Sequence, residues 1–188
     1  MAAAISRFDV PDLDELPDDI RERIVAVQEK SGFVPNVFLA FARRPKEFRA
    51  FFAFHDALMD SDEGLSKAER ELIVVATSAV NDCLYCVVAH GAILRIRAKD
   101  PLLADQVAIN PHKADLTDRQ RHIVTFALRV ARDSASITDD DLADLRSHGF
   151  TDDEIWDIGA ITALFALSNR YANFAGMRPN DEFFGMAR

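Results

Sequence analysis

The 188-residue sequence has few turn-forming residues and no long apolar stretch. Only seven glycines and seven prolines occur, and apolar and polar residues never alternate strictly over a sustained stretch, which disfavours an all-β fold. The longest apolar run, 158–167, is about half of the ~20 residues that a membrane span needs. The N-terminus shows neither a signal peptide nor a basic transit peptide. We therefore expect a largely helical, cytoplasmic protein.

Positive charge is also scarce. The 22 Lys and Arg residues face 31 Asp and Glu, giving a formal net charge of -9. Such a chain does not attract phosphate backbones or anionic lipid, so neither nucleic acid nor a membrane is expected as a partner.

The length predicts a single domain over 1–188, with an N-terminal extended arm over 1–19, a core over about 20–176 and a C-terminal tail over 177–188.

Start and stop signals divide the core into helices and predict an all-α fold. Early helices are expected over 20–30, 37–42 and 47–59, the first of them starting on Asp18 or Asp19. Four later starts pair a Ser or Thr with an acid or amide three residues on, which is the capping box: Ser66 with Glu69, Thr117 with Gln120, Thr138 with Asp141, and Thr151 with Glu154. Gly176 suits the end of a last long helix from Asp152 to about Ala175.

Two of these starts share a longer pattern. Leu65-Ser66-x-x-Glu69-Arg70-x-Leu72-Ile73 matches Leu116-Thr117-x-x-Gln120-Arg121-x-Ile123-Val124, which indicates a possible internal helical-hairpin repeat. In that alignment His122 takes the place of Glu71, either as the remnant of a second site or as an ordinary surface or core histidine. His55, on the phenylalanine-rich face of 47–59, is expected in the core, with a substrate pocket as the alternative.

Both cysteines of the chain fall in one motif, Cys83-Leu84-Tyr85-Cys86, and His90 follows four residues later. If Asn81 or Asp82 caps a new helix, both cysteines lie in its first turns, where free amides and the helix dipole favour thiolate. Steps of three and four residues return to one helix face, so His90 should lie within reach of Cys86.

Glu71 precedes Cys83 by twelve residues, within the helix expected to begin at Ser66. A turn near Asn81 would fold that helix back along the cysteine helix, so Glu71 could orient His90. The sequence thus predicts an acid, a base and a dithiol in one site, a combination that can couple proton transfer to thiol chemistry.

Three other roles are possible for the two cysteines. A structural disulfide would close a loop of about four residues, worth only ~2 kcal/mol against ~4.7 for a hundred-residue loop. Zinc would need four ligands, and the other histidines show no paired spacing: His55, His112, His122 and His148. The third role is that of two small buried apolar residues. Redox dithiol chemistry is favoured over all three, with no metal or cofactor expected.

The pattern of Glu71, Cys83-x-x-Cys86 and His90 resembles the active site of the alkylhydroperoxidase D family, within the carboxymuconolactone decarboxylase-like superfamily. The flanks are similar to a peroxidase-related branch of that superfamily, upstream in Gly32-Phe33-Val34-Pro35-Asn36-Val37-Phe38 and downstream from Trp156-Asp157-Ile158 through Asn169-Arg170.

This resemblance implies a helical bundle that forms homo-oligomers and reduces a small hydroperoxide without metal, haem or flavin. Cys86 would attack the peroxide, Cys83 would resolve the sulfenic acid to a disulfide, and His90 with Glu71 would manage protons. An external dithiol would restore the pair. Known members carry a histidine where Tyr85 stands, so two further functions stay open: thiol–disulfide exchange without efficient peroxidase activity, and a non-catalytic redox-sensing oligomer.

Overall fold

The computed structural model describes residues 4–61 and 63–188, which contain no strand, so the all-α prediction is confirmed. The α-helices are α1 Asp18–Ser31, α2 Asn36–Ala42, α3 Pro45–Met59, α4 Lys67–Val80, α5 Leu84–Ala98, α6 Leu103–Ile109, α7 Asp118–Asp133, α8 Asp139–Ser147, α9 Asp152–Ala175 and α10 Glu182–Gly185. Two short 3-10 helices lie at Leu13–Glu15 and Ser134–Ser136. Among the described residues, no helix combines the length and apolar character required to cross a bilayer.

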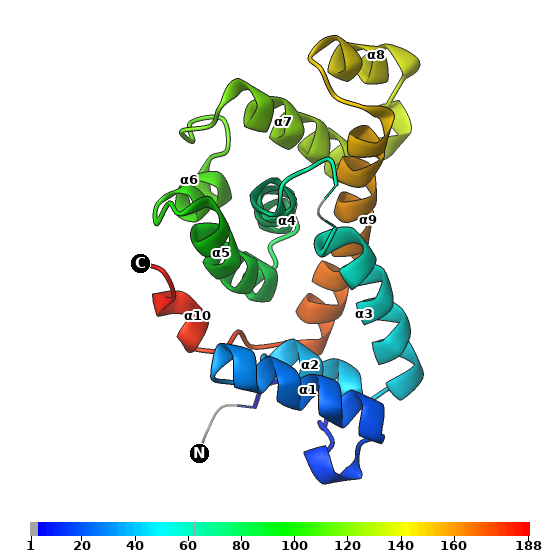
Figure 1. Cartoon of the computed structure of the whole chain (residues 1–188), viewed down its shortest axis with the longest axis vertical. Helices are drawn as coiled ribbons and strands as arrows, with labels where there is room; N and C mark the ends of the chain where they lie inside the picture. The colour runs from blue at the N-terminus through cyan, green and yellow to red at the C-terminus, as the bar shows by residue number, and fades with distance from the viewer. Residues whose placement is uncertain (1–3, 62) are drawn as a thin grey trace.

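Helix α4 forms the centre of the molecule. Figure 1 looks nearly along its axis, with α5, α6, α7 and α9 arranged around it. Every residue from 70 to 78 is buried, including the charged Arg70 and Glu71. A helix that is buried all round must satisfy its charged groups within the protein, so partners for Arg70 and Glu71 are the first thing to look for.

The predicted helix starts are largely confirmed. All four capping boxes form, at α4, α7, α8 and α9. Gly176 closes α9 in the left-handed region with a φ of 62°, a conformation that glycine adopts at little cost. Helix α6 was not predicted from the sequence. Asp100 stabilises its start by accepting hydrogen bonds from the amides of Leu102 and Leu103.

Both ends of the chain attach to the body of the molecule. In the N-terminal arm, the amide of Arg7 donates to Ala175 at 2.7 Å, and the amide of Arg178 donates to Ile5 at 3.0 Å. The predicted arm over 1–19 overlaps the start of α1 at Asp18, and its residues 1–3 lie outside the described residues. The C-terminal segment, expected only as a tail, contains α10 and a buried Phe183.

The two halves of the possible repeat have different environments. Helices α4 and α7 pack against each other and start alike. Yet Arg70 is fully buried, whereas Arg121, its counterpart, is exposed. The resemblance between the two segments therefore lies in their helix starts and does not extend to equivalent packing.

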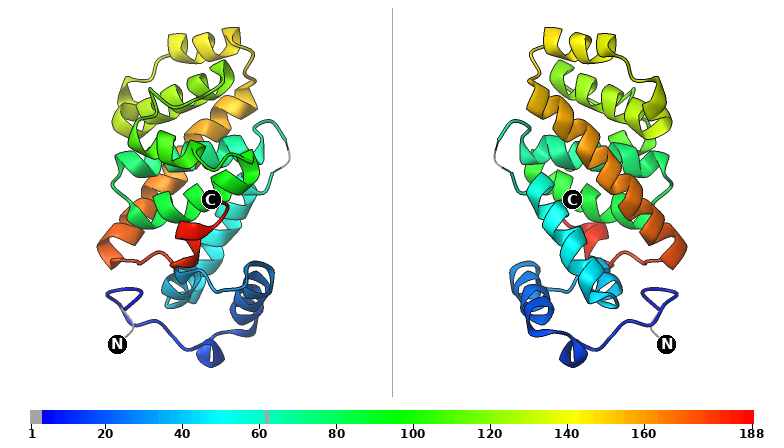
Figure 2. Two further views of the ribbon diagram at one scale, coloured as in Figure 1. Left: turned by 90° about the vertical axis from the view of Figure 1, so that its left-hand side faces the viewer. Right: turned by 90° about the vertical axis from the view of Figure 1, so that its right-hand side faces the viewer.

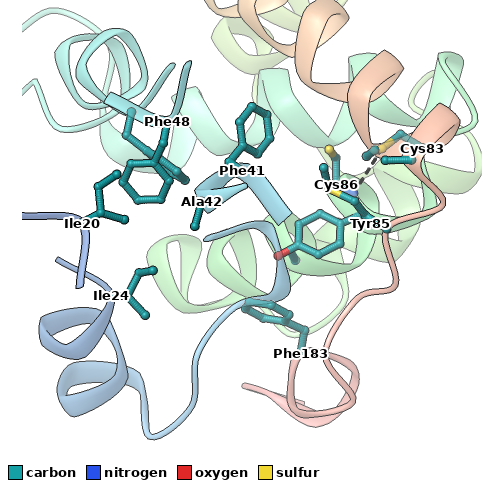
Figure 3. Close-up of a cluster of buried hydrophobic side chains, with 14 of the residues drawn as sticks. Ile20, Ile24, Phe41, Ala42, Phe48, Cys83, Tyr85, Cys86 and Phe183 are labelled. Carbon is teal, nitrogen blue, oxygen red and sulfur yellow. Dashed lines mark hydrogen bonds between the residues drawn. The ribbon is translucent and has the colours of Figure 1, made fainter. Parts of the chain in front are cut away.

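The cysteines belong to an apolar cluster that joins several helices. In Figure 2, α9 runs obliquely from the end that carries α8 toward the end formed by α1 and α2. The two cysteines share their cluster with Ile20 of α1, Phe41 of α2 and Phe183 of α10 (Figure 3). The C-terminal segment is fixed there by the buried Arg95 of α5, which donates to the carbonyls of residues 183 and 186. Elements distant in sequence thus enclose the motif.

Candidate active site

The cysteine motif begins α5 in a way that corrects one expectation. Cys83 itself is the N-cap of α5, instead of Asn81 or Asp82, and its sulfur accepts a hydrogen bond from the amide of Cys86 at 3.4 Å (dashed in Figure 3). The turn from α4 is tight because Asp82 adopts a φ of 50°. The Cys83 amide then donates to Ser78 at 3.0 Å. A cysteine in the capping position places its sulfur against the free amides of the first turn.

The two thiols are free and almost fully buried, and they interact with each other. The Cys86 thiol donates to Cys83, and together with the Cys86 amide it lowers the pKa of Cys83 to about 7. The same hydrogen bond retains the proton of Cys86, and with burial it raises the pKa of Cys86 well above its ordinary value. Cys83 is therefore the first of the two thiols to ionise, whereas the family resemblance implied a thiolate on Cys86.

Glu71 and His90 meet as the sequence predicted. The Nδ1 atom of His90 lies 2.7 Å from Oε2 of Glu71, and both side chains are nearly buried. An ionised carboxylate only accepts hydrogen bonds, so Nδ1 carries the proton and Nε2 of a neutral His90 is left with a lone pair. His90 lies one turn beyond Cys86 on the same helix, which places its ring beside that sulfur.

Helix α9 supplies polar partners that the sequence analysis did not assign to the site. Asn169 donates to Ser78 at 2.9 Å and accepts from Asn81 at 2.9 Å, so it fastens the α4–α5 turn to α9. Hydrogen bonding to Asn169 also helps to lower the pKa of Cys83. Ser168 lies 3.9 Å from the sulfur of Cys86. No local sequence pattern connects Asn169 with the cysteines, because its contacts with the motif depend on the tertiary fold.

A cavity of about 600 Å³ leads to the motif. Cys86 and His90 line it, and Cys83 does not. Most of its wall is apolar, with contributions from Phe33, Val37, Phe38, Phe51, Phe52, Ala89, Ile93, Phe165, Phe183 and Met186. His55 of α3 also lines the cavity and is only partly buried, so it does not lie in the closed core where the sequence analysis expected it. A small apolar molecule entering here meets Cys86 before Cys83.

Tyr85 has a structural position within the motif. Its hydroxyl accepts a hydrogen bond from the amide of Val37 at 3.1 Å and points away from the sulfurs (Figure 3). Burial raises the pKa of Tyr85 well above its usual range, so the phenol stays protonated at neutral pH. It therefore connects the start of α5 to the start of α2 and does not replace an imidazole in proton transfer.

We expect Tyr85→Phe to lower the free energy of unfolding by about 1–2 kcal/mol, because the partly buried amide of Val37 loses its acceptor. The pKa of the dithiol should stay unchanged, since the hydroxyl does not contact either sulfur. Urea unfolding measures the first quantity, and the pH dependence of thiolate absorbance or alkylation measures the second. A shifted thiol pKa in a folded variant would show that the phenol takes part in the chemistry.

The remaining histidine prediction concerns His122. Its ring packs against His148 with centroids 3.9 Å apart, and with Asp144 these side chains bring possible metal-binding atoms within 4.8 Å of one another. Within 4–61 and 63–188 this is the sole group of three such side chains, and it does not include the cysteines. His122 therefore does not form a second copy of the Glu71–His90 arrangement.

Comparisons with known proteins agree with this geometry. The carboxymuconolactone decarboxylase family model matches residues 45–101, which include Glu71, both cysteines and His90. A search of curated proteins found no significant match.

Solved structures give a closer comparison. One similar structure is the alkylhydroperoxidase AhpD core of an uncharacterised peroxidase-related protein from Ralstonia eutropha JMP134. Its sequence is 66% identical to this chain, the TM-score is 0.98, and the match covers 100% of this chain and 98% of that one. A peroxidase-related protein from Silicibacter sp. TM1040 is 42% identical, with a TM-score of 0.94 over 99% and 97%. The debrominase Bmp8, 15% identical with a TM-score of 0.78 over 97% and 95%, shares the fold. This chain therefore belongs to the alkylhydroperoxidase D-like group of the carboxymuconolactone decarboxylase superfamily.

Proposed function

We propose that this protein is a dithiol peroxidase that reduces small hydroperoxides and is recharged by an external dithiol. The observation that carries the proposal is the position of Cys86 in the wall of an apolar cavity, with Cys83 behind it and the Glu71–His90 pair beside it. A dithiol buried from bulk water but open to a small cavity is suited to a small oxidant.

The first step forms a sulfur–oxygen bond at Cys86. The dithiol loses one proton, with Nε2 of His90 as the base and Glu71 holding the ring, and leaves a monoanion whose charge rests mostly on Cys83. Transfer of the shared proton from Cys86 to Cys83 creates the Cys86 thiolate. That thiolate attacks the terminal peroxide oxygen, the O–O bond breaks, and the products are Cys86 sulfenic acid and an alkoxide that takes up a proton to become an alcohol.

The second half of the cycle restores the dithiol. The Cys83 thiol condenses with the sulfenic acid, forming a disulfide and releasing water. An external dithiol then reduces that disulfide and is itself oxidised to a disulfide. These steps transfer electrons only among sulfur and oxygen atoms. A reducing compartment keeps the pair as thiols between turnovers, so we place the protein in the cytoplasm.

We also propose that the protein forms a homo-oligomer. Several large apolar side chains are exposed, among them Ile109 at 84% and Trp156 at 75% of their surface. Burial of such side chains between copies removes apolar surface from water.

The peroxidase proposal is tested by adding one equivalent of cumene hydroperoxide to the reduced protein. We expect the intact mass to fall by two hydrogen atoms and both free thiols to disappear in a thiol titration. Further hydroperoxide should be consumed when a small dithiol is supplied in excess. An unchanged mass, with the thiols still titratable, would contradict the proposal.

The same experiment separates two other functions. A thiol–disulfide exchange protein would react rapidly with small dithiols in its oxidised form and only slowly with hydroperoxide in its reduced form. A redox sensor would oxidise once and then change its oligomeric mass without sustained turnover. The enclosure of Cys86 within a cavity favours a small oxidant over a protein disulfide as the substrate.

A further inference from the structure

A second imidazole–carboxylate pair lines the same cavity as His90. Nδ1 of His55 lies 3.2 Å from Oδ1 of Asp56, and Arg23 of α1 contacts both oxygens of that carboxylate, at 2.8 and 2.9 Å. The hydrogen bond from His55, with those from Arg23, holds the pKa of Asp56 well below its usual range. Asp56 is therefore an anion that orients the ring of His55 through this hydrogen bond.

His55 faces His90 from a different helix. Their ring centroids are 6.4 Å apart, and the ring of Phe165 on α9 contacts both, at 6.2 Å from His55 and 4.7 Å from His90. Because Nδ1 of His55 is directed to Asp56, Nε2 is its free nitrogen. The side chain keeps about a quarter of its surface exposed, so a molecule in the cavity can reach it.

The proposed peroxide reaction needs an acid on the side of the cavity away from the sulfur. In a displacement at oxygen, the attacking sulfur and the departing alkoxide lie on opposite sides of the oxygen atom that is attacked. His90 shares α5 with Cys86 and lies beside the attacking atom. The alkoxide forms at the far end, and as a strong base in an apolar cavity it needs a proton before or as it leaves. His55 projects into the cavity from α3 instead.

We propose that His55 is a second catalytic residue, the general acid that protonates the departing alkoxide. This inference rests on the proposed peroxidase function. Protonated His55 gives the proton on Nε2 to the alkoxide oxygen as the O–O bond breaks, which yields an alcohol, Cys86 sulfenic acid and neutral His55. A proton from solvent then restores the acid. Asp56 and Arg23 act as positioning residues, since they fix the ring without contacting the peroxide.

The test compares two oxidants in His55→Gln. An alkyl hydroperoxide releases a strongly basic alkoxide. A peroxycarboxylic acid releases a carboxylate instead, and this weak base needs no proton because the pKa of its conjugate acid is only about 4–5. We expect the second-order rate constant for oxidation of the reduced variant by cumene hydroperoxide to fall about 100-fold or more. The rate constant with peracetic acid should change by less than about threefold, since general acid catalysis contributes little there.

The pH profile gives a second readout. With cumene hydroperoxide, the wild-type rate should rise as the dithiol ionises near pH 7, because the thiolate is the attacking species. The rate should fall again where the general acid is no longer protonated, and His55→Gln should lack that fall. The charged and titratable groups that line the cavity beside His55 are Asp56 on α3, Arg23 and Lys30 on α1, and Tyr85, Cys86, His90 and Arg97 on α5, with Glu71 of α4 behind His90.

The controls separate this inference from the proposal beneath it. His112→Gln removes an exposed histidine outside the cavity and should leave both rate constants unchanged. Equal losses with both oxidants in His55→Gln would assign His55 a structural role, and an unchanged rate with cumene hydroperoxide would remove it from the reaction; either result overturns the inference alone. A wild-type protein inert to both oxidants would overturn the peroxidase proposal as well.

Discussion

Cys86→Ser should abolish oxidation by hydroperoxide, with a rate loss of at least about 1,000-fold, because it removes the one thiol among the described residues that line the cavity. Cys83→Ser should still react once. In that variant no resolving thiol remains, so the Cys86 sulfenic acid should persist and be trapped by dimedone as a mass increase. Serine keeps the size of the side chain, so both variants should fold.

The two variants also test the electrostatics of the pair. Cys83 raises the pKa of Cys86 both by retaining its proton in a hydrogen bond and by its charge. Removing Cys83 should therefore lower the pKa of Cys86 toward its ordinary value. Thiolate absorbance as a function of pH measures this shift. A dimedone adduct on Cys83 in Cys86→Ser, formed at the wild-type rate, would reverse the assigned order of attack and resolution.

Arg70→Met should destabilise the fold by about 3–5 kcal/mol, a large part of the ~5–15 kcal/mol that stabilises a typical domain. The Arg70 guanidinium is fully buried and donates to the carbonyls of Leu58 and Glu63, each at 2.7 Å, and of Leu65 at 3.1 Å. It also pairs with Asp157 at 2.8 Å. Methionine would leave three carbonyls and one carboxylate without their partner.

Arg121→Met is the matched control for this prediction. Arg121 occupies the same place after the capping box of α7, but it is exposed, and within the part of the chain that the structure describes its side chain donates to one carbonyl, that of Leu116, at 3.1 Å. Its replacement should cost less than about 1 kcal/mol. Guanidinium chloride unfolding measures both values. Equal costs for the two variants would show that the buried network around Arg70 contributes little.

Helix starts were the most predictable part of the fold, because their signals are local. A Ser or Thr with an acid or amide three residues later satisfies free amides within a single turn, and all four such starts occur where the sequence placed them. Helix α6 lacked such a pair, since Asp100 alone begins it. Helix α10 is too short for a periodic pattern, and its burial depends on contacts with distant Arg95.

The part of the candidate site that lies on neighbouring helices was predictable from the sequence, and the part that comes from distant helices was not. Glu71, Cys83, Cys86 and His90 lie on two helices joined by one turn, so their spacing indicated that they meet. His55 and Asn169 lie on α3 and α9, and no spacing rule connects them to the cysteines. The lowered pKa of Cys83 also required coordinates, because it depends on which sulfur lies in the capping position.

The separate origins of the sulfur unit and the cavity wall have an evolutionary consequence. The dithiol with its Glu71–His90 pair is encoded within the short stretch 71–90, whereas much of the wall comes from α1, α2 and α3. Substitutions in those three helices can alter the shape and polarity of the cavity while residues 71–90, which carry the dithiol and the Glu71–His90 pair, remain unchanged. Related chains can thus diverge toward different oxidants and inherit the same redox chemistry.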